Sequence, residues 1–212
     1  MSKITKIEIQ KRNKERVNLF LDGEYAFSLS AELVYKEGLK TNENVDGIKL
    51  KALAEKDTII RCKDSALRII ERSYKTEKEV RDKLKLKGYD ENSINQSIKF
   101  LKEYNFLNDD NYTKMFIKDK LNTQGINKIK YGLIKKGVSK EIIEKELSNV
   151  DKEDEKTIAL NLAKKKIITI RKSESDNFKA SGKLYRFLMS KGYSYDVVKD
   201  VVKEVMTVDD FE

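Results

Sequence analysis

The chain has 212 residues, of which 38% are charged and 39% are apolar, and its formal net charge is +9. It has no histidine and one cysteine, which excludes Ser-His and Cys-His catalytic pairs, Cys-His metal sites and an internal disulfide. The absence of proline and of long apolar runs predicts a helical protein without a membrane span or secretory signal, which we expect in the cytoplasm.

Residues 4–29 are predicted to form three short strands. Apolar and polar residues alternate there, as in half-buried strands, and Asp22-Gly23 is a strong hairpin signal. Three strands are marginally stable alone, so we expect their apolar face to pack on a helix over residues 31–37 that ends at Gly38.

The register of this hairpin stays open at the level of sequence. A two-residue turn would pair Phe20 with Tyr25, whereas a three-residue loop would place Leu19 opposite Phe27.

A long helical pattern follows over residues 49–74. Cys62 lies within it, and we interpret it as a packing residue rather than a reactive thiol. The spacing of Thr76 and Glu79 then predicts a capping box that opens the next helix.

A unit of helix, glycine stop and helix is then repeated three times. Each copy contains a Leu, two further residues and Lys-Gly, and we interpret Gly88, Gly137 and Gly192 as structural helix stops, with the lysine beside the C-terminal carbonyls. An Asp or Ser able to cap the next helix stands two residues after each glycine. Apolar residues follow six, ten and thirteen residues after each glycine: Ile94, Ile98, Leu101; Ile143, Leu147, Val150; Val198, Val202, Val205. A fixed period of this kind predicts a stacked array.

The predicted fold is mainly α, with tandem three-helix repeats in an elongated curved array and a small N-terminal β-hairpin or meander module. The predicted segments are a strand module with a short helix (1–48), a connecting helix (49–74), the rest of repeat 1 (75–108), repeat 2 (109–150), repeat 3 (151–206) and a frayed tail (207–212). The third repeat is longer than the second, and we expect its extra residues in the polar segment 171–177.

The excess of lysine and arginine allows a polyanion partner, because these side chains release counterions from phosphates. Candidate contacts with DNA or a protein–DNA filament are Lys164, Lys165, Lys166, Arg171, Lys172, Lys179, Lys183 and Arg186, for which an ordinary solvated face is an equal alternative. The following aromatic residues could stack on bases, but their helical spacing favours a core role: Tyr104, Phe106, Tyr112, Phe116, Phe178, Tyr185, Phe187, Tyr193 and Tyr195.

The carboxylates show no catalytic pairing. Asp109 and Asp110, like Glu77 and Glu79, are better explained as capping or solvated groups. We therefore expect neither an enzyme nor a bound cofactor or metal.

Four stretches closely resemble the RecX family, bacterial regulatory proteins that modulate the recombinase RecA. They are Leu84–Tyr89 (LKLKGY), Leu107–Tyr112 (LNDDNY), Gly125–Val138 and the more divergent Leu188–Tyr193. Together these stretches cover about residues 60 to 206. The strand-rich first sixty residues resemble the N-terminal extension of some members of the family, notably from Gram-positive bacteria.

The resemblance implies a non-enzymatic protein that binds the RecA filament on single-stranded DNA. Double-stranded DNA is a further candidate partner, and we expect no membrane partner. We expect a monomer, but the oligomeric state stays open. The resemblance also implies inhibition of recombinase, ATPase and co-protease activities in homologous recombination and the SOS response to DNA damage. Two questions stay open: whether this protein inhibits or stimulates its recombinase, and whether it caps filament ends or binds along the filament groove. The alternatives are a direct nucleic-acid-binding repeat protein without a recombinase partner and a scaffold for another protein.

Overall fold

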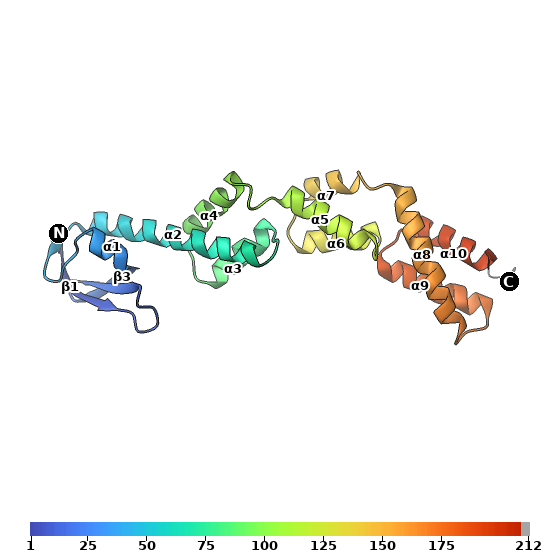
Figure 1. The fold of residues 1–212 in the computed structure, drawn as a ribbon, viewed down its shortest axis with the longest axis horizontal. Helices are drawn as coiled ribbons and strands as arrows, with labels where there is room; N and C mark the ends of the chain where they lie inside the picture. The colour runs from blue at the N-terminus through green and yellow to red at the C-terminus, as the bar shows by residue number, and fades with distance from the viewer. Residues whose placement is uncertain (209–212) are drawn as a thin grey trace. The chain divides into compact units, whose positions relative to one another are not determined.

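The structure is a computed structural model that describes residues 1–208. A small antiparallel sheet is followed by a series of helices (Figure 1). The chain divides into two compact units, one made of residues 1–73 and 80–106 and the other of residues 74–79 and those from 107 onward. The mainly helical fold class, with three-helix repeats and an N-terminal strand module, is confirmed.

The sheet lies at the start of the first unit, with strand order β3-β2-β1-β4. Its strands are β1 (Ser2–Ile9), β2 (Arg16–Leu21), β3 (Glu24–Ser30) and β4 (Asn44–Val45). The short helix α1 (Ala31–Lys36) follows β3 directly, as predicted, and the left-handed Gly38 comes just after it. The sequence does not predict β4, because two residues are too few to show an alternating pattern.

The β2–β3 hairpin contains both registers that the sequence left open. The Asp22-Gly23 turn has φ angles of 50° and 95°, so it is a two-residue turn and Phe20 pairs with Tyr25. The register then shifts at a β-bulge, and Leu19 pairs with Phe27. The bulge restores the alternation that buries the apolar residues of both strands on one face.

The buried face of the sheet packs on the first half of α2 (Gly47–Arg72), the long helix predicted at this position. The core of this module consists of Ile4, Val17, Leu19, Leu29, Leu50 and Ala54. Its strands therefore gain from α2 the apolar contacts that three or four isolated strands would lack.

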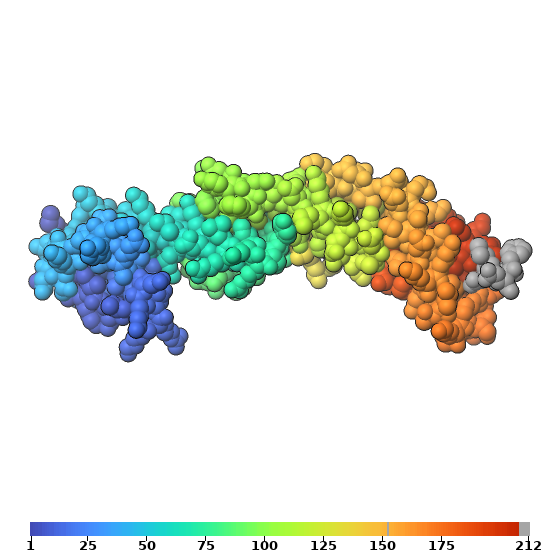
Figure 2. Space-filling model, in the orientation of Figure 1, coloured from blue at the N-terminus to red at the C-terminus, as the bar shows by residue number. Residues whose placement is uncertain are grey.

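The helices form three repeats. The second half of α2 combines with α3 (Glu77–Leu86) and α4 (Glu91–Glu103); next come α5 (Asp109–Leu121), α6 (Ile126–Lys135) and α7 (Lys140–Leu147); the last are α8 (Lys152–Arg171), α9 (Asn177–Lys191) and α10 (Tyr195–Val208). Ile94, Ile143 and Val198, the first residues of the three predicted apolar stripes, are fully buried. Within the second unit, the side chains of α5 to α10 form one continuous body (Figure 2).

The three predicted glycine stops are confirmed. Gly88, Gly137 and Gly192 have φ angles of 82°, 79° and 90°, a region that favours glycine. In each copy the N–H of the residue after glycine donates to the carbonyl of the motif leucine, at 3.2 to 3.4 Å. The Leu-x-x-Lys-Gly spacing thus encodes a Schellman stop.

The second unit contains one packing arrangement twice, in which a following repeat holds the N-terminus of a helix. At the start of α3, the Thr76 hydroxyl donates to the Lys136 carbonyl at 2.6 Å, and the Glu77 N–H donates to the Asp109 carboxylate at 2.9 Å. The Lys136 ammonium donates to Glu79 at 2.7 Å. Thr76 and Glu79 also bond each other's N–H groups, which confirms the capping box. The box therefore both caps α3 and contacts the second repeat.

Partial burial disfavours the charges of both groups in the Glu79–Lys136 pair. Several favourable interactions together outweigh this cost: the hydrogen bond between the two groups, their opposite charges, the Thr76 N–H beside Glu79 and Tyr112 beside Lys136. The pKa of Glu79 therefore lies below its ordinary value and the pKa of Lys136 above its own.

The same arrangement recurs at the start of α6. The Gly125 N–H donates to the Lys191 carbonyl at 3.0 Å, and the Ile126 N–H donates to the Glu155 carboxylate at 2.8 Å. Asp109 and Glu155, each in the first turn of its own helix, thus cap the N-terminus of an earlier helix. The expectation that Asp109 or Asp110 caps α5 is wrong, since Asn108 accepts from the Asn111 N–H.

Two of the glycine stops are also contact points between elements. The Lys78 side chain lies on Gly137 and Lys128 lies on Gly192, so closely that a Cβ at either glycine would clash. At Gly88 a Cβ would meet no described atom within 4 Å. The interpretation of all three glycines as stops alone is therefore incomplete.

The third repeat is longer than the second, but its extra residues do not form the polar insertion that we expected at residues 171–177. α9 has 15 residues where α6 has 10, and α8 has 20 where α5 has 13. The additional residues lengthen the helices, because Ile167, Ile170 and Ala180 continue a buried apolar stripe toward the polar loop.

At the C-terminal end, α10 includes residues 207 and 208, the first two of the predicted tail, and residues 209–212 lie outside the described residues. In the described part of the chain no helix combines the length and apolar character needed to cross a bilayer.

Candidate nucleic-acid interface

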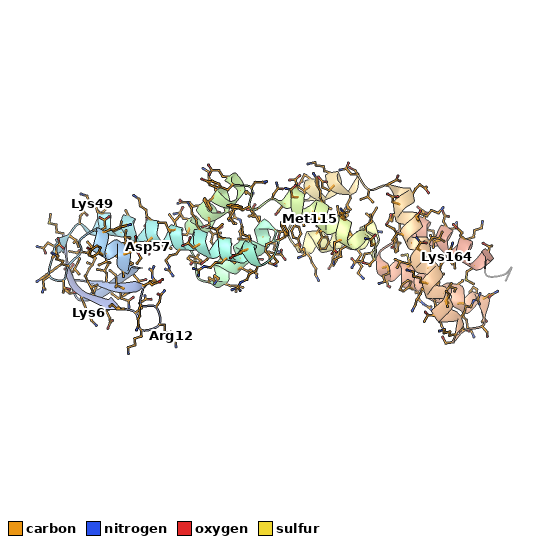
Figure 3. The ribbon with its side chains drawn as sticks, in the orientation of Figure 1. Lys6, Arg12, Lys49, Asp57, Met115 and Lys164 are labelled. Carbon is orange, nitrogen blue, oxygen red and sulfur yellow. The ribbon has the colours of Figure 1, made fainter. Side chains whose placement is uncertain are left out.

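The eight predicted basic contacts lie on α8, on α9 and in the loop that joins them. Figure 3 shows Lys164 on α8. Five of the eight side chains are exposed: Lys164, Lys165, Lys172, Lys179 and Arg186. Exposed cations of this kind can reach phosphate oxygens without breaking contacts that hold the fold.

The other three basic side chains make contacts within the third repeat. The Lys166 ammonium lies 5.3 Å from the centre of the Phe187 ring, and the Lys183 ammonium lies 3.1 Å from the Glu174 carboxylate. The hydrogen bond from Lys183 holds the pKa of Glu174 below its ordinary value. Arg171 is half-buried, and its guanidinium approaches a carbonyl of the α8–α9 loop. These three residues are thus less suited to phosphate contact.

The aromatic residues interpreted as core divide into two groups. Tyr193 is 1% exposed, and Tyr112, Phe116, Tyr185 and Phe187 are half-buried. The core interpretation is wrong for four others, which are exposed: Tyr104, Phe106, Phe178 and Tyr195. All four lie at or just beyond a helix end, where the apolar stripe no longer directs side chains inward.

Two of these exposed aromatics belong to a series of three rings in the first repeat, which we call the aromatic ladder: Phe100, Tyr104 and Phe106. The ring centres of Phe100 and Tyr104 are 4.9 Å apart, and those of Tyr104 and Phe106 are 6.2 Å apart with planes 16° from parallel. The Lys63 ammonium, from α2, lies 5.0 Å from the centre of the Phe100 ring. The ladder therefore combines aromatic faces with a cation, the two components of single-strand binding surfaces.

A signal for the ladder was present in the sequence. Phe100 and Tyr104 are spaced i, i+4, but they are offset from the stripe of Ile94, Ile98 and Leu101, which predicts a different face of the helix. The spacing of residues within α4 could not predict the contribution of Lys63, because Lys63 lies on a separate helix, α2.

The one cysteine of the chain is held in the core. Cys62 is fully buried, and burial raises the pKa of its thiol, so the interpretation as a packing residue is confirmed. Across residues 1–208 no group of three or more Asp, Glu or Cys side chains has the arrangement of a metal site. The surface features described above are suited to binding.

These features define a helical-repeat binding protein: three-helix units with exposed basic side chains, preceded by a strand module. The chain belongs to the RecX family of regulatory proteins. Residues 2–46 match the regulatory protein RecX N-terminal domain, and residues 62–101, 108–147 and 153–202 match the first, second and third three-helix domains of RecX.

Relatives match over the full length of the chain. The regulatory protein RecX of Clostridium beijerinckii is 65% identical, over 99% of this chain and 98% of its own. That of Clostridium botulinum strain Alaska E43 is 63% identical over all of both chains, and that of Clostridioides difficile is 34% identical over all of both.

Solved structures show the same fold. A crystal structure of regulatory protein RecX has a TM-score of 0.68 and 26% identity, covering 95% of this chain and 98% of its own. The crystal structure of RecX from Lactobacillus salivarius has a TM-score of 0.64 and 28% identity, covering 70% of this chain and 97% of its own.

Proposed function

We propose that this protein binds the RecA filament on single-stranded DNA and inhibits its recombinase, ATPase and co-protease activities, without catalysing a reaction itself. It acts as a cytoplasmic monomer during homologous recombination and the response to DNA damage. The observation that carries the proposal is the match of this chain to all four domains of the RecX family, in order and along nearly its whole length.

The exposed basic residues of the third repeat support a role at a protein–DNA filament. Lys164, Lys165 and Lys172 all come from the region of α8 and its following loop, and among the described residues none of them forms an ion pair that would compete with phosphate. Cations of this kind gain binding free energy by displacing counterions from DNA.

The test is ATP hydrolysis by RecA of the same organism on single-stranded DNA, titrated with this protein. Loss of hydrolysis at well below one copy per RecA supports filament capping or disassembly, and loss near one copy per few RecA subunits supports binding along the filament. Unchanged hydrolysis at an excess of the protein rejects the proposal.

A pair of charge-reversal variants tests the surface itself. The triple variant K164E/K165E/K172E removes three exposed cations from the third repeat, and K11E/R12E/K14E makes the same charge change in the exposed β1–β2 loop, where Figure 3 shows Arg12. Weaker inhibition by the first variant alone supports contact through α8. Equal effects would show that only net charge matters.

The same basic residues also favour a second candidate, direct binding to nucleic acid without a recombinase. In that case the affinity for bare DNA is high and falls steeply with salt, whereas a filament regulator binds bare DNA weakly and needs RecA. Titration of labelled single-stranded and double-stranded DNA at several salt concentrations, with and without RecA, separates the two.

A further inference from the structure

The aromatic ladder of the first repeat is exposed although it consists of large apolar rings. Tyr104 is 61% exposed and Phe106 is 55% exposed. Their rings lie nearly parallel to each other at this end of α4.

The backbone holds these two rings in place. Asn105, between them, has a left-handed φ of 55°, and its N–H donates to the Lys102 carbonyl at 2.9 Å. The Phe106 N–H donates to the Leu101 carbonyl at 2.8 Å. These two bonds close the end of α4 as a Schellman-type turn, which fixes the chain direction on both sides of Asn105. The backbone that carries the ring pair is therefore already ordered before a ligand binds.

The repeat architecture does not require the ladder. Phe100 lies twelve residues after the glycine stop of its repeat, and the corresponding residues of the other two repeats are Asn149 and Glu204. Since polar residues stand at the corresponding position of the other repeats, the ring at Phe100 and the two that follow it need a reason other than stacking of the repeats.

Cations accompany the rings. Lys63 is held over the Phe100 ring, and Lys99 is exposed on α4 beside Phe100 in the sequence. Apolar docking of a protein partner would not need these charges at its centre, since charged residues are depleted there. Rings with a lysine held over one of them, and a second exposed lysine on the same helix, instead match the pattern of stacked bases with phosphates beside them.

We infer that the aromatic ladder is a single-stranded DNA site, in which bases stack on Tyr104 and Phe106 while Lys63 and Lys99 approach the phosphates. The inference rests on the proposed function for the identity of the nucleic acid, and it adds a second contact region, in the first repeat, to the basic residues of the third. Duplex DNA keeps its base faces stacked inside the helix and does not bind in this mode.

A tryptophan placed in the ladder tests base stacking directly. The chain has no tryptophan, so Tyr104→Trp introduces a single indole, and Tyr35→Trp introduces one at a matched position that is 88% exposed on α1. We expect a short oligothymidylate to quench the Y104W fluorescence in a saturable way, duplex of the same length to leave it unchanged, and neither to affect Y35W. Binding of the oligothymidylate measured by anisotropy without quenching of Y104W overturns the inference, as does an absence of binding.

Leucine substitutions separate stacking from apolar docking. The double variant Y104L/F106L keeps apolar area but removes both ring faces, and we expect its affinity for oligothymidylate to fall about tenfold or more, with an unchanged melting curve. Unchanged affinity overturns the inference.

Parallel ATPase assays with RecA keep this inference distinct from the proposed function. If Y104L/F106L loses filament inhibition but binds oligothymidylate normally, the ladder docks protein, and only the stacking inference fails. If Y104W is quenched but the unmodified protein does not inhibit RecA, only the proposed function fails.

Discussion

The Arg16 guanidinium donates to the Asp57 carboxylate at 2.8 Å, and the two side chains are only 6% and 7% exposed. Arg16 begins β2 and Asp57 lies on α2, where Figure 3 shows it, so the pair joins the sheet to the long helix. The second guanidinium nitrogen donates to the Ser28 carbonyl on β3 at 2.7 Å. A buried pair with these additional bonds fixes one orientation of the sheet on α2, even where its net stabilisation is small.

Removing only one partner should therefore be costly. We expect Asp57→Ala to lower the free energy of unfolding by about 3–5 kcal/mol, because it leaves the Arg16 charge buried without its carboxylate. The double change R16M/D57L should cost less, since neither charge remains. Urea denaturation followed by circular dichroism measures both.

The exposed pair Lys6–Glu8, at 3.0 Å, provides the control. Glu8→Ala should change stability by less than about 1 kcal/mol. A D57A protein as stable as E8A would show that Arg16 reaches water in solution.

The three glycine stops should differ in their tolerance of alanine. All three have positive φ, so Gly88→Ala should cost about 1–2 kcal/mol from backbone strain alone. Gly192→Ala should cost more, because its Cβ would stand 2.6 Å from the Lys128 backbone nitrogen. Gly137→Ala should fall between, because the atoms nearest to its Cβ belong to the Lys78 side chain rather than to backbone. Thermal melting of the three variants gives the order, and three equal losses would contradict the contacts at Gly137 and Gly192.

These glycines also show how far the sequence could predict the fold. Local signals were sufficient for the stops, the capping box and the apolar stripes, because each depends on residues within one or two turns. The same local reasoning missed that Lys78 and Lys128 lie on glycines of a following repeat, since this contact depends on how repeats stack. It likewise identified the basic residues of α8 and α9 but could not separate exposed Lys164 from Lys183, whose partner is Glu174.

Tyr193 provides a test at alkaline pH. Its hydroxyl is buried without a hydrogen-bond partner among the described residues, and burial, together with the nearby Glu155 charge, raises its pKa from 10.0 to about 12. As the pH rises from 10 to 12, the unfolded chain loses the phenol proton while the folded chain retains it, so stability falls across this window. Tyr193→Phe should remove about 2 kcal/mol of this loss.

The same substitution should stabilise the protein near pH 7 by about 1 kcal/mol, because it removes a buried hydroxyl without a partner. Melting temperatures of the unmodified protein and Y193F at neutral and alkaline pH measure both effects. Tyr35→Phe, at an exposed position, should retain the pH dependence of the unmodified protein. A hydroxyl bound by internal water would instead make Y193F less stable at pH 7.

The capping box at α3 should be worth more than an ordinary helix cap. Thr76→Val removes both the cap and the bond to the Lys136 carbonyl, with an expected loss of about 2–3 kcal/mol. Ser139→Ala removes the cap of α7, whose bond to the Ile142 N–H is 3.4 Å, and an exposed bond to Glu141, but no bond to another repeat, and it should cost about 1 kcal/mol or less. Equal losses in urea denaturation would show that the bond to Lys136 adds nothing.

Acid should weaken the Glu79–Lys136 pair. The pKa of Glu79 is lower in the folded protein than its ordinary value, so the pair stabilises the fold at neutral pH and this contribution is lost as the pH falls below the ordinary range of carboxylates. Glu79→Gln should lower stability at pH 7 but bring the variant closer to the unmodified protein in acid. A difference that is constant with pH would contradict this.

The basic residues of the third repeat should divide into two groups. Those with internal contacts should contribute to the stability of the fold, and those that are exposed should contribute to DNA binding. Lys166→Gln and Lys183→Gln lose the contacts with Phe187 and Glu174, and each should cost about 0.5–1 kcal/mol of folding free energy with little change in DNA affinity.

The exposed triple variant K164Q/K165Q/K172Q should melt like the unmodified protein. If all three lysines contact phosphates, this variant should reduce the slope of log K against log salt for single-stranded DNA by about 2, because each contact contributes about 0.7. The reverse result, with K166Q and K183Q losing affinity and the exposed variant binding normally, would place the DNA contact on the inner face of the α8–α9 hairpin.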